Sequence, residues 1–120
     1  MQKMIVKKPW GTYEVLLDEP NYKVKRIVVH PYERFSLQYH KHREEHWVIV
    51  EGDGIVQVNE KEYPAYVRTH WVILPTQKHR ATAGPNGLVF IETQIGRCEE
   101  EDIIRLEDDY GRLDSSEVSV

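Results

Sequence analysis

The chain has 120 residues, a length that fits one domain with a single hydrophobic core. Apolar residues make up 40% of it and charged residues 30%, as in a folded globular protein and unlike a disordered segment. The formal net charge of −4, from 20 acidic against 16 basic residues, argues against a nucleic-acid partner. We therefore expect a single domain, residues 1–120. Basic residues gather at 7–8, 23–26 and 34–43, which favours a small anionic ligand over a polymer.

Cysteine content and hydropathy indicate a cellular compartment. Cys98 is the only cysteine, which excludes an intrachain disulfide and favours a reducing environment. The amino terminus has no apolar stretch of signal-peptide length, and no segment approaches the roughly 20 apolar residues of a membrane span. These features predict a cytoplasmic protein without a membrane partner.

Short runs rich in β-branched and aromatic residues alternate with turn formers along most of the chain, which predicts an all-β sandwich or barrel. Turns are expected at 18–21, 52–54 and 84–87, where Gly, Pro, Asn and Asp gather. Residues 59–61 predict a tight hairpin. The expected strands are 13–17, 22–30, 34–40, 45–50, 55–58, 62–67, 71–74, 79–82 and 88–95.

The pattern changes after Gly96. Acidic residues at 99–102 precede a short apolar run at 103–106, as is typical of a helix amino terminus, where negative charge is favourable. We predict one short carboxy-terminal helix in this region. Residues 115–120 carry no pattern and are expected to be frayed.

One short segment is rich in side chains that bind metals. Residues two apart on a strand share a face, so Gln38 and His40 project together. If the chain turns at 41–44 and returns as a paired strand, Glu45 faces the same interior. His79, from a later strand, would complete a set of one amide oxygen, two imidazole nitrogens and one carboxylate.

This set of ligands suits one divalent transition metal, such as Zn, Co, Mn, Ni or Fe, better than Ca or Mg. With water in its open coordination positions, such an ion is a Lewis acid that polarises a carbonyl. A single histidine is more often a surface or core residue than a ligand, so the prediction depends on the cluster. His42 and His46 remain rival ligands.

The same residues resemble the first cupin motif, in the variant where Gln replaces the first His, with Gly52 closing the motif and His79 where the second motif supplies its histidine. Further segments resemble the type II mannose-6-phosphate isomerase domain, found at the carboxy terminus of bifunctional mannose-1-phosphate guanylyltransferases. The resemblance covers about residues 8–112 and implies a cupin fold, a double-stranded β-helix or jelly-roll barrel. It depends on residues 8–13, 22–27, 36–40, 43–47 and 107–112.

Several positions depart from the family pattern. Tyr32 stands where the first motif begins with Gly, and 69–70 reads Thr-His where the second motif begins with Gly-Asp. Ala83 replaces an expected Asn. The turn at 75–78 is one residue short and lacks its Gly, so we expect it to shift His79, the fourth ligand.

The resemblance implies interconversion of mannose 6-phosphate and fructose 6-phosphate, by proton transfer between C1 and C2 through an enediol. This reaction would serve mannose, GDP-mannose and polysaccharide precursor metabolism. The metal would polarise the carbonyl. His42 and Lys25 are the candidates for proton transfer, because they lie near the predicted ligands in sequence or in strand phase. Basic side chains at family positions would bind the phosphate. They are Arg34, Arg43, Arg80 and Arg112.

Other functions stay open at this point. The altered second motif favours a non-catalytic cupin that binds a sugar phosphate or sugar nucleotide, or that assists a separate guanylyltransferase. A third candidate is an iron-dependent oxygen-activating enzyme or a sugar-nucleotide epimerase. These 120 residues lack a glycine-rich nucleotide-binding signature, so we expect no nucleotidyl transfer from them. By analogy with other small barrels, the aromatic residues near Trp10 and Trp71 predict a homodimer.

Overall fold

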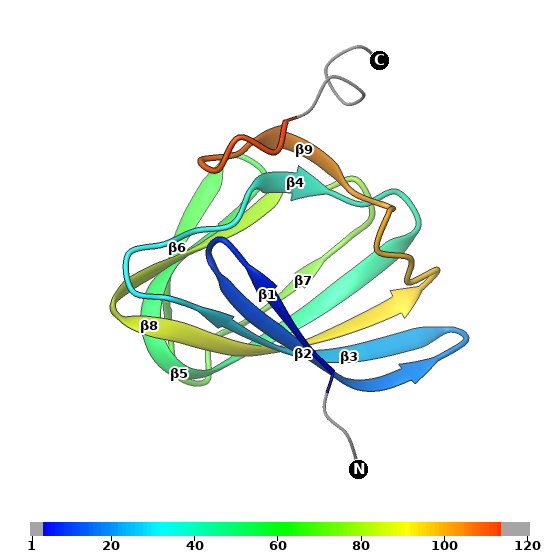
Figure 1. The fold of residues 1–120 in the computed structure, drawn as a ribbon, viewed down its shortest axis with the longest axis horizontal. Coiled ribbons are helices and arrows are strands. Elements are labelled where there is room, and N and C mark those ends of the chain that lie inside the picture. Colours follow the sequence, from blue (N-terminus) through cyan, green and yellow to red (C-terminus); the bar gives the residue numbers. More distant parts are fainter. Residues whose placement is uncertain (1–3, 114–120) are drawn as a thin grey trace.

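The structure is a computed structural model that describes residues 4–113. Nine strands form one connected antiparallel sheet that curls round an interior (Figure 1). This confirms the all-β prediction. Within 4–113 no helix is long and apolar enough to cross a membrane. The strands are β1 (Met4–Lys8), β2 (Gly11–Glu19), β3 (Tyr22–Val29), β4 (Leu37–Tyr39), β5 (Arg43–Val58), β6 (Lys61–Tyr66), β7 (His70–Ile73), β8 (His79–Gly96) and β9 (Ile104–Glu107).

The two longest strands, β5 and β8, pair with each other from end to end and form the frame of the barrel. The first half of β5 lies between β7 and β8, and its second half lies between β6 and β8. Register shifts between these halves, at 49–51 and 52–54, mark β-bulges, which bend a strand. Each long strand therefore contributes to two walls.

The sequence prediction divided each of these long strands into two, with a break at 52–54 and another at 84–87. In the structure the chain continues as a strand through both places. Gly52 pairs with Leu88 and Gly54 pairs with Ala83, so residues 84–87 bulge out opposite a single residue of β5. The turns predicted at 52–54 and 84–87 are therefore wrong: the turn-forming residues shift the strand register there but do not end the strands.

The remaining strands extend the two walls. β1, β2 and β3 continue the sheet from the second half of β8, and β4 pairs with the first residue of β8. β4 and β9 run side by side along one edge (Figure 1). β1 was not expected from the sequence, and the expected strand 34–40 is reduced to β4 and an isolated bridge between Arg34 and Thr82.

The predicted carboxy-terminal helix is wrong. Its apolar run forms β9, which pairs with β4 and occupies an edge that would otherwise leave backbone groups of β4 unpaired. The acidic residues in front of it have partners elsewhere in the fold. The Glu100 carboxylate lies 2.7 Å from Lys25 Nζ, and the Asp102 carboxylate accepts the backbone N–H groups of Lys41 and His42. Residues 115–120, expected to be frayed, lie outside the described residues.

The hairpin expected at 59–61 is confirmed. Val58 pairs with Lys61, which leaves a two-residue loop of Asn59 and Glu60 between β5 and β6. Asn59 has a φ of 54°, a left-handed conformation that Asn tolerates better than most residues.

An aromatic cluster lies at the centre of the core between the walls. The ring centroids are 5.4 Å apart for Trp10 and Phe35, 5.9 Å for Phe35 and Trp47, and 4.5 Å for Trp47 and Phe90. Trp10 is only 7% exposed, so it packs inside the barrel and not on a surface where a dimer contact would need it. The homodimer stays a prediction.

Two glycines with similar backbone conformations provide a test of the bulge in β5. Gly52 has a φ of +79°, and a Cβ there would lie 2.0 Å from the carbonyl oxygen of Gly87. Gly111 has a φ of +75°, with nothing within 4 Å of a Cβ. We predict that Gly52→Ala lowers the free energy of unfolding by about 2–5 kcal/mol, because it adds a backbone clash to the conformational strain.

Gly111→Ala is the matched control for this substitution. It carries the strain of a positive φ alone and should lower the free energy of unfolding by about 1–2 kcal/mol. Denaturant titrations of both variants measure the difference. Equal losses would show that the contact of Gly52 with Gly87 does not constrain the fold.

Candidate metal centre

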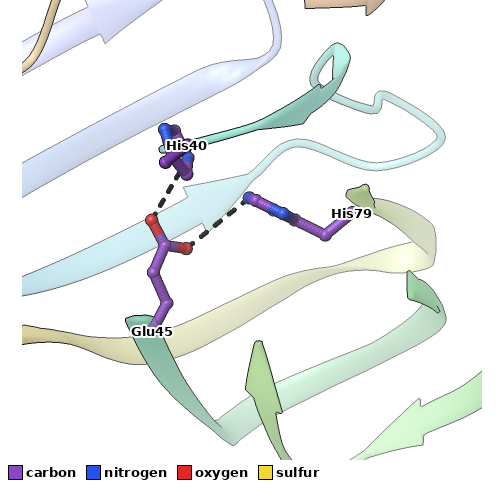
Figure 2. A group of neighbouring side chains, drawn as sticks. All are labelled: His40, Glu45 and His79. Carbon is purple, nitrogen blue, oxygen red and sulfur yellow. Dashed lines mark ion pairs between the residues drawn. The ribbon is translucent and has the colours of Figure 1, made fainter. Parts of the chain in front are cut away.

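Three buried side chains from separate segments point toward one another (Figure 2). His40 follows β4, Glu45 lies on β5 and His79 begins β8. His40 Nε2 is 3.2 Å from Glu45 Oε2, and His79 Nε2 is 3.7 Å from Glu45 Oε1. One ligand atom from each lies within 4.8 Å of the other two. We call these three residues the triad.

Strand pairing explains how the triad is assembled. Burial alternates along β5, so Glu45 faces the interior in phase with Trp47, as the sequence predicted. Gln38 on β4 is the register partner of His79 on β8. The turn before His79 is fixed by the backbone N–H of Thr76, which donates to the carbonyl of His40 at 2.7 Å. The shortened turn thus still brings its histidine to the other two ligands.

The Nδ1–H groups of the two histidines are committed to backbone carbonyls, which directs each Nε2 toward the triad as a potential ligand atom. The Nδ1–H of His40 donates to the carbonyl of Asp102 at 2.5 Å, and that of His79 donates to the carbonyl of Gln77 at 2.9 Å. Burial, together with the positive charge of Arg43, lowers the pKa of His40 to about 3. Burial also lowers the pKa of His79 to about 4. Both rings are therefore neutral at neutral pH, as metal ligands must be.

The triad fits a divalent ion. His79 Nε2 is buried and has no hydrogen-bond partner among residues 4–113, which is costly for an acceptor inside a protein. An ion between the two rings and the carboxylate would use this lone pair. Gln38, the other predicted ligand, lines the adjacent pocket, and its Oε1 accepts a hydrogen bond from Ser36 at 3.3 Å.

The carboxylate of the triad is tied to the aromatic core. Trp47 Nε1 donates to Glu45 Oε1 at 3.0 Å and to Glu92 Oε1 at 3.1 Å. Gln94 Nε2 donates to the second oxygen of Glu92 at 2.7 Å. Burial, together with the charge of Glu45, raises the pKa of Glu92 to about 7. The indole therefore fixes two buried carboxyl groups that would otherwise repel each other.

A pocket of about 140 Å³ is lined by two members of the triad, His40 and Glu45. Five cationic and three acidic side chains line it, so positive charge is in excess. An anionic ligand is favoured by this balance. The cationic residues are Lys8, Lys25, Arg43, Arg105 and Arg112, and the acidic residues are Glu45, Glu92 and Glu100.

The structure brings some predicted substrate and catalytic residues to this pocket and leaves others away from it. Lys25, Arg43 and Arg112 line it. Arg34 is outside its lining and forms a bidentate pair with Asp109 at 2.7 and 2.9 Å. Arg112 is paired in the same way with an aspartate, but at the pocket.

Three further predicted or rival residues also lie outside the lining. Arg80 is buried, where it donates to the carbonyl of Phe35 and to Glu107. His42 is exposed, and His46 lies on the outward side of β5, 2.6 Å from a carboxylate oxygen of Glu44. The structure therefore does not bring His42 or His46 to the triad.

Sequence reasoning missed several pocket residues. Glu92 lines the pocket, and it lies in phase with Phe90 and with its hydrogen-bond partner Gln94 on the inward face of β8. This polar interruption of an apolar face was a usable signal. Lys8 belongs to a strand that was not predicted. Glu100 was assigned to a helix, which concealed its place beside Lys25.

Comparison with solved structures identifies the fold as that of a cupin. An RmlC-like cupin from Shewanella frigidimarina matches with a TM-score of 0.74 and 20% identity, over 83% of this chain and 88% of that one. PAC13 from Streptomyces, solved with uridine, matches at 0.77 and 16%, over 88% and 86%. The capsular polysaccharide assembling protein CapF from Staphylococcus aureus matches at 0.78 and 16%, over 88% and 34%.

The family model described as mannose-6-phosphate isomerase C-terminal matches residues 1–108. The mannose-1-phosphate guanylyltransferase of Klebsiella pneumoniae is 39% identical over 108 residues, and the alginate biosynthesis protein AlgA of Pseudomonas aeruginosa is 40% identical over 109. These alignments cover 88% and 89% of this chain but 23% of each relative. The chain belongs to the mannose-6-phosphate isomerase C-terminal family, and the predicted resemblance is confirmed.

We predict that divalent ions stabilise chelator-treated protein through the triad. An ion that binds only the folded state should add about 2.7 kcal/mol when its free concentration is about 100 times its Kd. Thermal unfolding with and without Zn²⁺ or Co²⁺ measures this gain. His79→Ala should abolish it, whereas His46→Ala, on the outward side of β5, should retain it. A melting temperature of the parent protein that does not respond to any transition metal would refute the site.

Metal-free protein should become less stable as the pH falls below 6.5. Because the pKa of His40 is lowered from 6.5 to about 3 and that of His79 to about 4, the unfolded chain binds protons in this range that the folded chain does not. Glu92 acts in the opposite sense between 4.5 and about 7, because its pKa is raised, but one carboxyl opposes two imidazoles.

Denaturant titrations between about pH 7 and pH 5 measure this decline. A double variant, His40→Gln with His79→Gln, should show a shallower decline, because it lacks both imidazoles. If the parent protein instead gains stability over the same interval, the two rings do not remain neutral in the fold.

Proposed function

We propose that this domain interconverts mannose 6-phosphate and fructose 6-phosphate with the help of a divalent metal, in the supply of mannose for polysaccharide precursors. The triad beside a pocket with excess positive charge carries the proposal. Membership of the isomerase C-terminal family supports it. The chain spans about a quarter of the relatives named guanylyltransferases, and we propose no nucleotidyl transfer for this segment.

His40, Glu45 and His79 would hold the ion, with Gln38 as the fourth ligand. The ion would supply a Lewis acid that polarises the sugar carbonyl. The indole of Trp47 keeps the carboxylate of Glu45 in place through its 3.0 Å hydrogen bond. Orientation of the sugar then depends on the cationic side chains of the pocket.

The phosphate should bind where positive charges crowd one another. Burial, with the nearby charges of Arg105 and Arg112, lowers the pKa of Lys8. A bound dianion would relieve this repulsion and pair with all three side chains. Of the predicted arginines, Arg112 therefore suits the phosphate best, and it is already oriented by its two hydrogen bonds to Asp108.

Lys25 is the better placed of the two predicted proton-transfer residues. It is buried at the pocket wall, and its Nζ lies 2.7 Å from Glu100 Oε2 and 4.0 Å from the ring centroid of Tyr13. The Lys25–Glu100 pair can hold a proton at the pocket wall and exchange it with the sugar. His42 is exposed and lies outside the lining.

A coupled assay for conversion of mannose 6-phosphate to fructose 6-phosphate tests the proposal. Chelator-treated protein supplied with Co²⁺, Zn²⁺, Mn²⁺ or Ni²⁺ should turn substrate over, and His40→Ala should not. Lys25→Gln should lower kcat by about 100-fold or more, as expected for loss of a proton-transfer group. His42→Gln should keep turnover near that of the parent.

The opposite results are equally informative. If the protein binds metal and sugar phosphate without turnover, the proposed isomerase activity is wrong. The function is then that of a non-catalytic cupin, which the altered second motif favours. Loss of turnover in His42→Gln, with Lys25→Gln unaffected, would reverse the assignment of the proton-transfer residue.

A further inference from the structure

Arg43 lies among the ligands of the triad and is itself buried, with 6% of the residue exposed. Its Nε donates to Glu45 Oε2 at 2.9 Å, and its Nη2 lies 3.2 Å from His40 Nε2. The third nitrogen, Nη1, donates to the carbonyl of Glu99 at 3.0 Å. The guanidinium thus occupies one side of the triad as a planar cation with three anchors.

The contact with His40 uses the lone pair that a metal would need. Because the Nδ1–H of His40 is committed to Asp102, its Nε2 is the acceptor of the ring, and Nη2 of Arg43 is the donor. An sp² nitrogen has one lone pair, so this hydrogen bond and a metal–nitrogen bond exclude each other. The other ring, His79, has no such donor on its Nε2.

The charges lead to the same conflict. Arg43 is the cation hydrogen-bonded to the buried Glu45, and a carboxylate in that position requires a positive partner. A divalent ion at the triad would neutralise the carboxylate and would repel a guanidinium at hydrogen-bond distance from two of its ligands. We propose that Arg43 competes with the metal for His40 and Glu45, and that metal binding releases its guanidinium into the pocket.

Release would connect the metal to the binding of an anion. Arg43 lines the pocket, so the freed guanidinium needs only to leave the triad to face a ligand there. It presents the planar pair of donors that suits a phosphate. The proposal rests on the metal site of the proposed function and adds that the metal, when bound, makes one more cation available to the substrate.

The first test is the affinity of chelator-treated protein for Co²⁺, measured by competition with a chromophoric chelator. Arg43→Gln removes the competing charge and should bind Co²⁺ about 10- to 100-fold more tightly, the factor expected for loss of a charged hydrogen bond that opposes binding. Arg43→Lys retains the charge but cannot bridge both ligands. Its affinity for Co²⁺ should therefore lie between that of the parent and that of Arg43→Gln. This variant keeps the test valid if the glutamine variant folds poorly.

Arg80→Gln is the matched control, because Arg80 is equally buried but bonds Phe35 and Glu107 away from the triad. Its affinity for Co²⁺ should equal that of the parent. Unchanged or weaker binding by both Arg43 variants, with a parent protein that binds Co²⁺ through His79, would overturn the competition and leave the metal site standing. If neither the parent nor any variant binds Co²⁺, both the metal site and the competition are overturned.

The second test uses inorganic phosphate as the probe, by calorimetry with and without saturating Co²⁺. In the parent, Co²⁺ should strengthen phosphate binding several-fold, and Arg43→Gln should lose most of that gain. An equal gain in both proteins would mean that phosphate contacts the ion alone and that release of Arg43 does not serve the anion.

Discussion

The pairing of β5 with β8 is the contact on which the rest of this structure depends. Bulges let the two strands bend together and pass from one wall of the barrel to the other, and the pairing resumes on either side of each bulge. Every other strand except β1, β2 and β9 pairs directly with one of them. The same pairing places Glu45 and Trp47 of β5 in the same interior as His79, Glu92 and Gln94 of β8. The backbone pairing of β5 with β8 therefore determines both the shape of the barrel and the position of the site residues.

The interior has an apolar part and a charged part, joined by one side chain. Trp47 packs against Phe35 and Phe90 with its ring, and donates its N–H to Glu45 and Glu92. Buried carboxylates are tolerated only with partners. The indole of Trp47, the guanidinium of Arg43, and the side chains of His40, His79 and Gln94 are therefore structural requirements of the fold. The pocket has reactive groups because the inward faces of β5 and β8 carry Glu45 and Glu92 among their apolar residues.

Strand content and strand phase were predictable because they depend on local spacing. The alternation along β5 correctly placed Glu45 inward, and the turn formers correctly marked 59–61 as a hairpin. The same local reasoning failed at 99–106, where an acidic start and an apolar run suggested a helix. Backbone pairing with β4 and the partners of Glu100 outweighed that weak preference, since propensity yields to tertiary context. His42, a predicted proton-transfer residue and rival ligand, lies exposed in the turn before β5 and out of phase with Glu45.

The sequence by itself predicted an all-β chain and proposed Gln38, His40, Glu45 and His79 as metal ligands, because these predictions follow from residue types at short spacings. Its motifs also resemble those of the family to which the chain belongs. Only the tertiary structure decided that carbonyls fix the histidine tautomers, that Arg43 shares the ligands of the triad, and that Lys8 and Glu92 enter the pocket. Some of those contacts, such as that of His40 with Asp102, join residues far apart in the chain, and others, such as those of Arg43 with His40 and Glu45, join neighbours across a turn. Their geometry is set by strand register and by the need to pair buried charges, which no local pattern encodes.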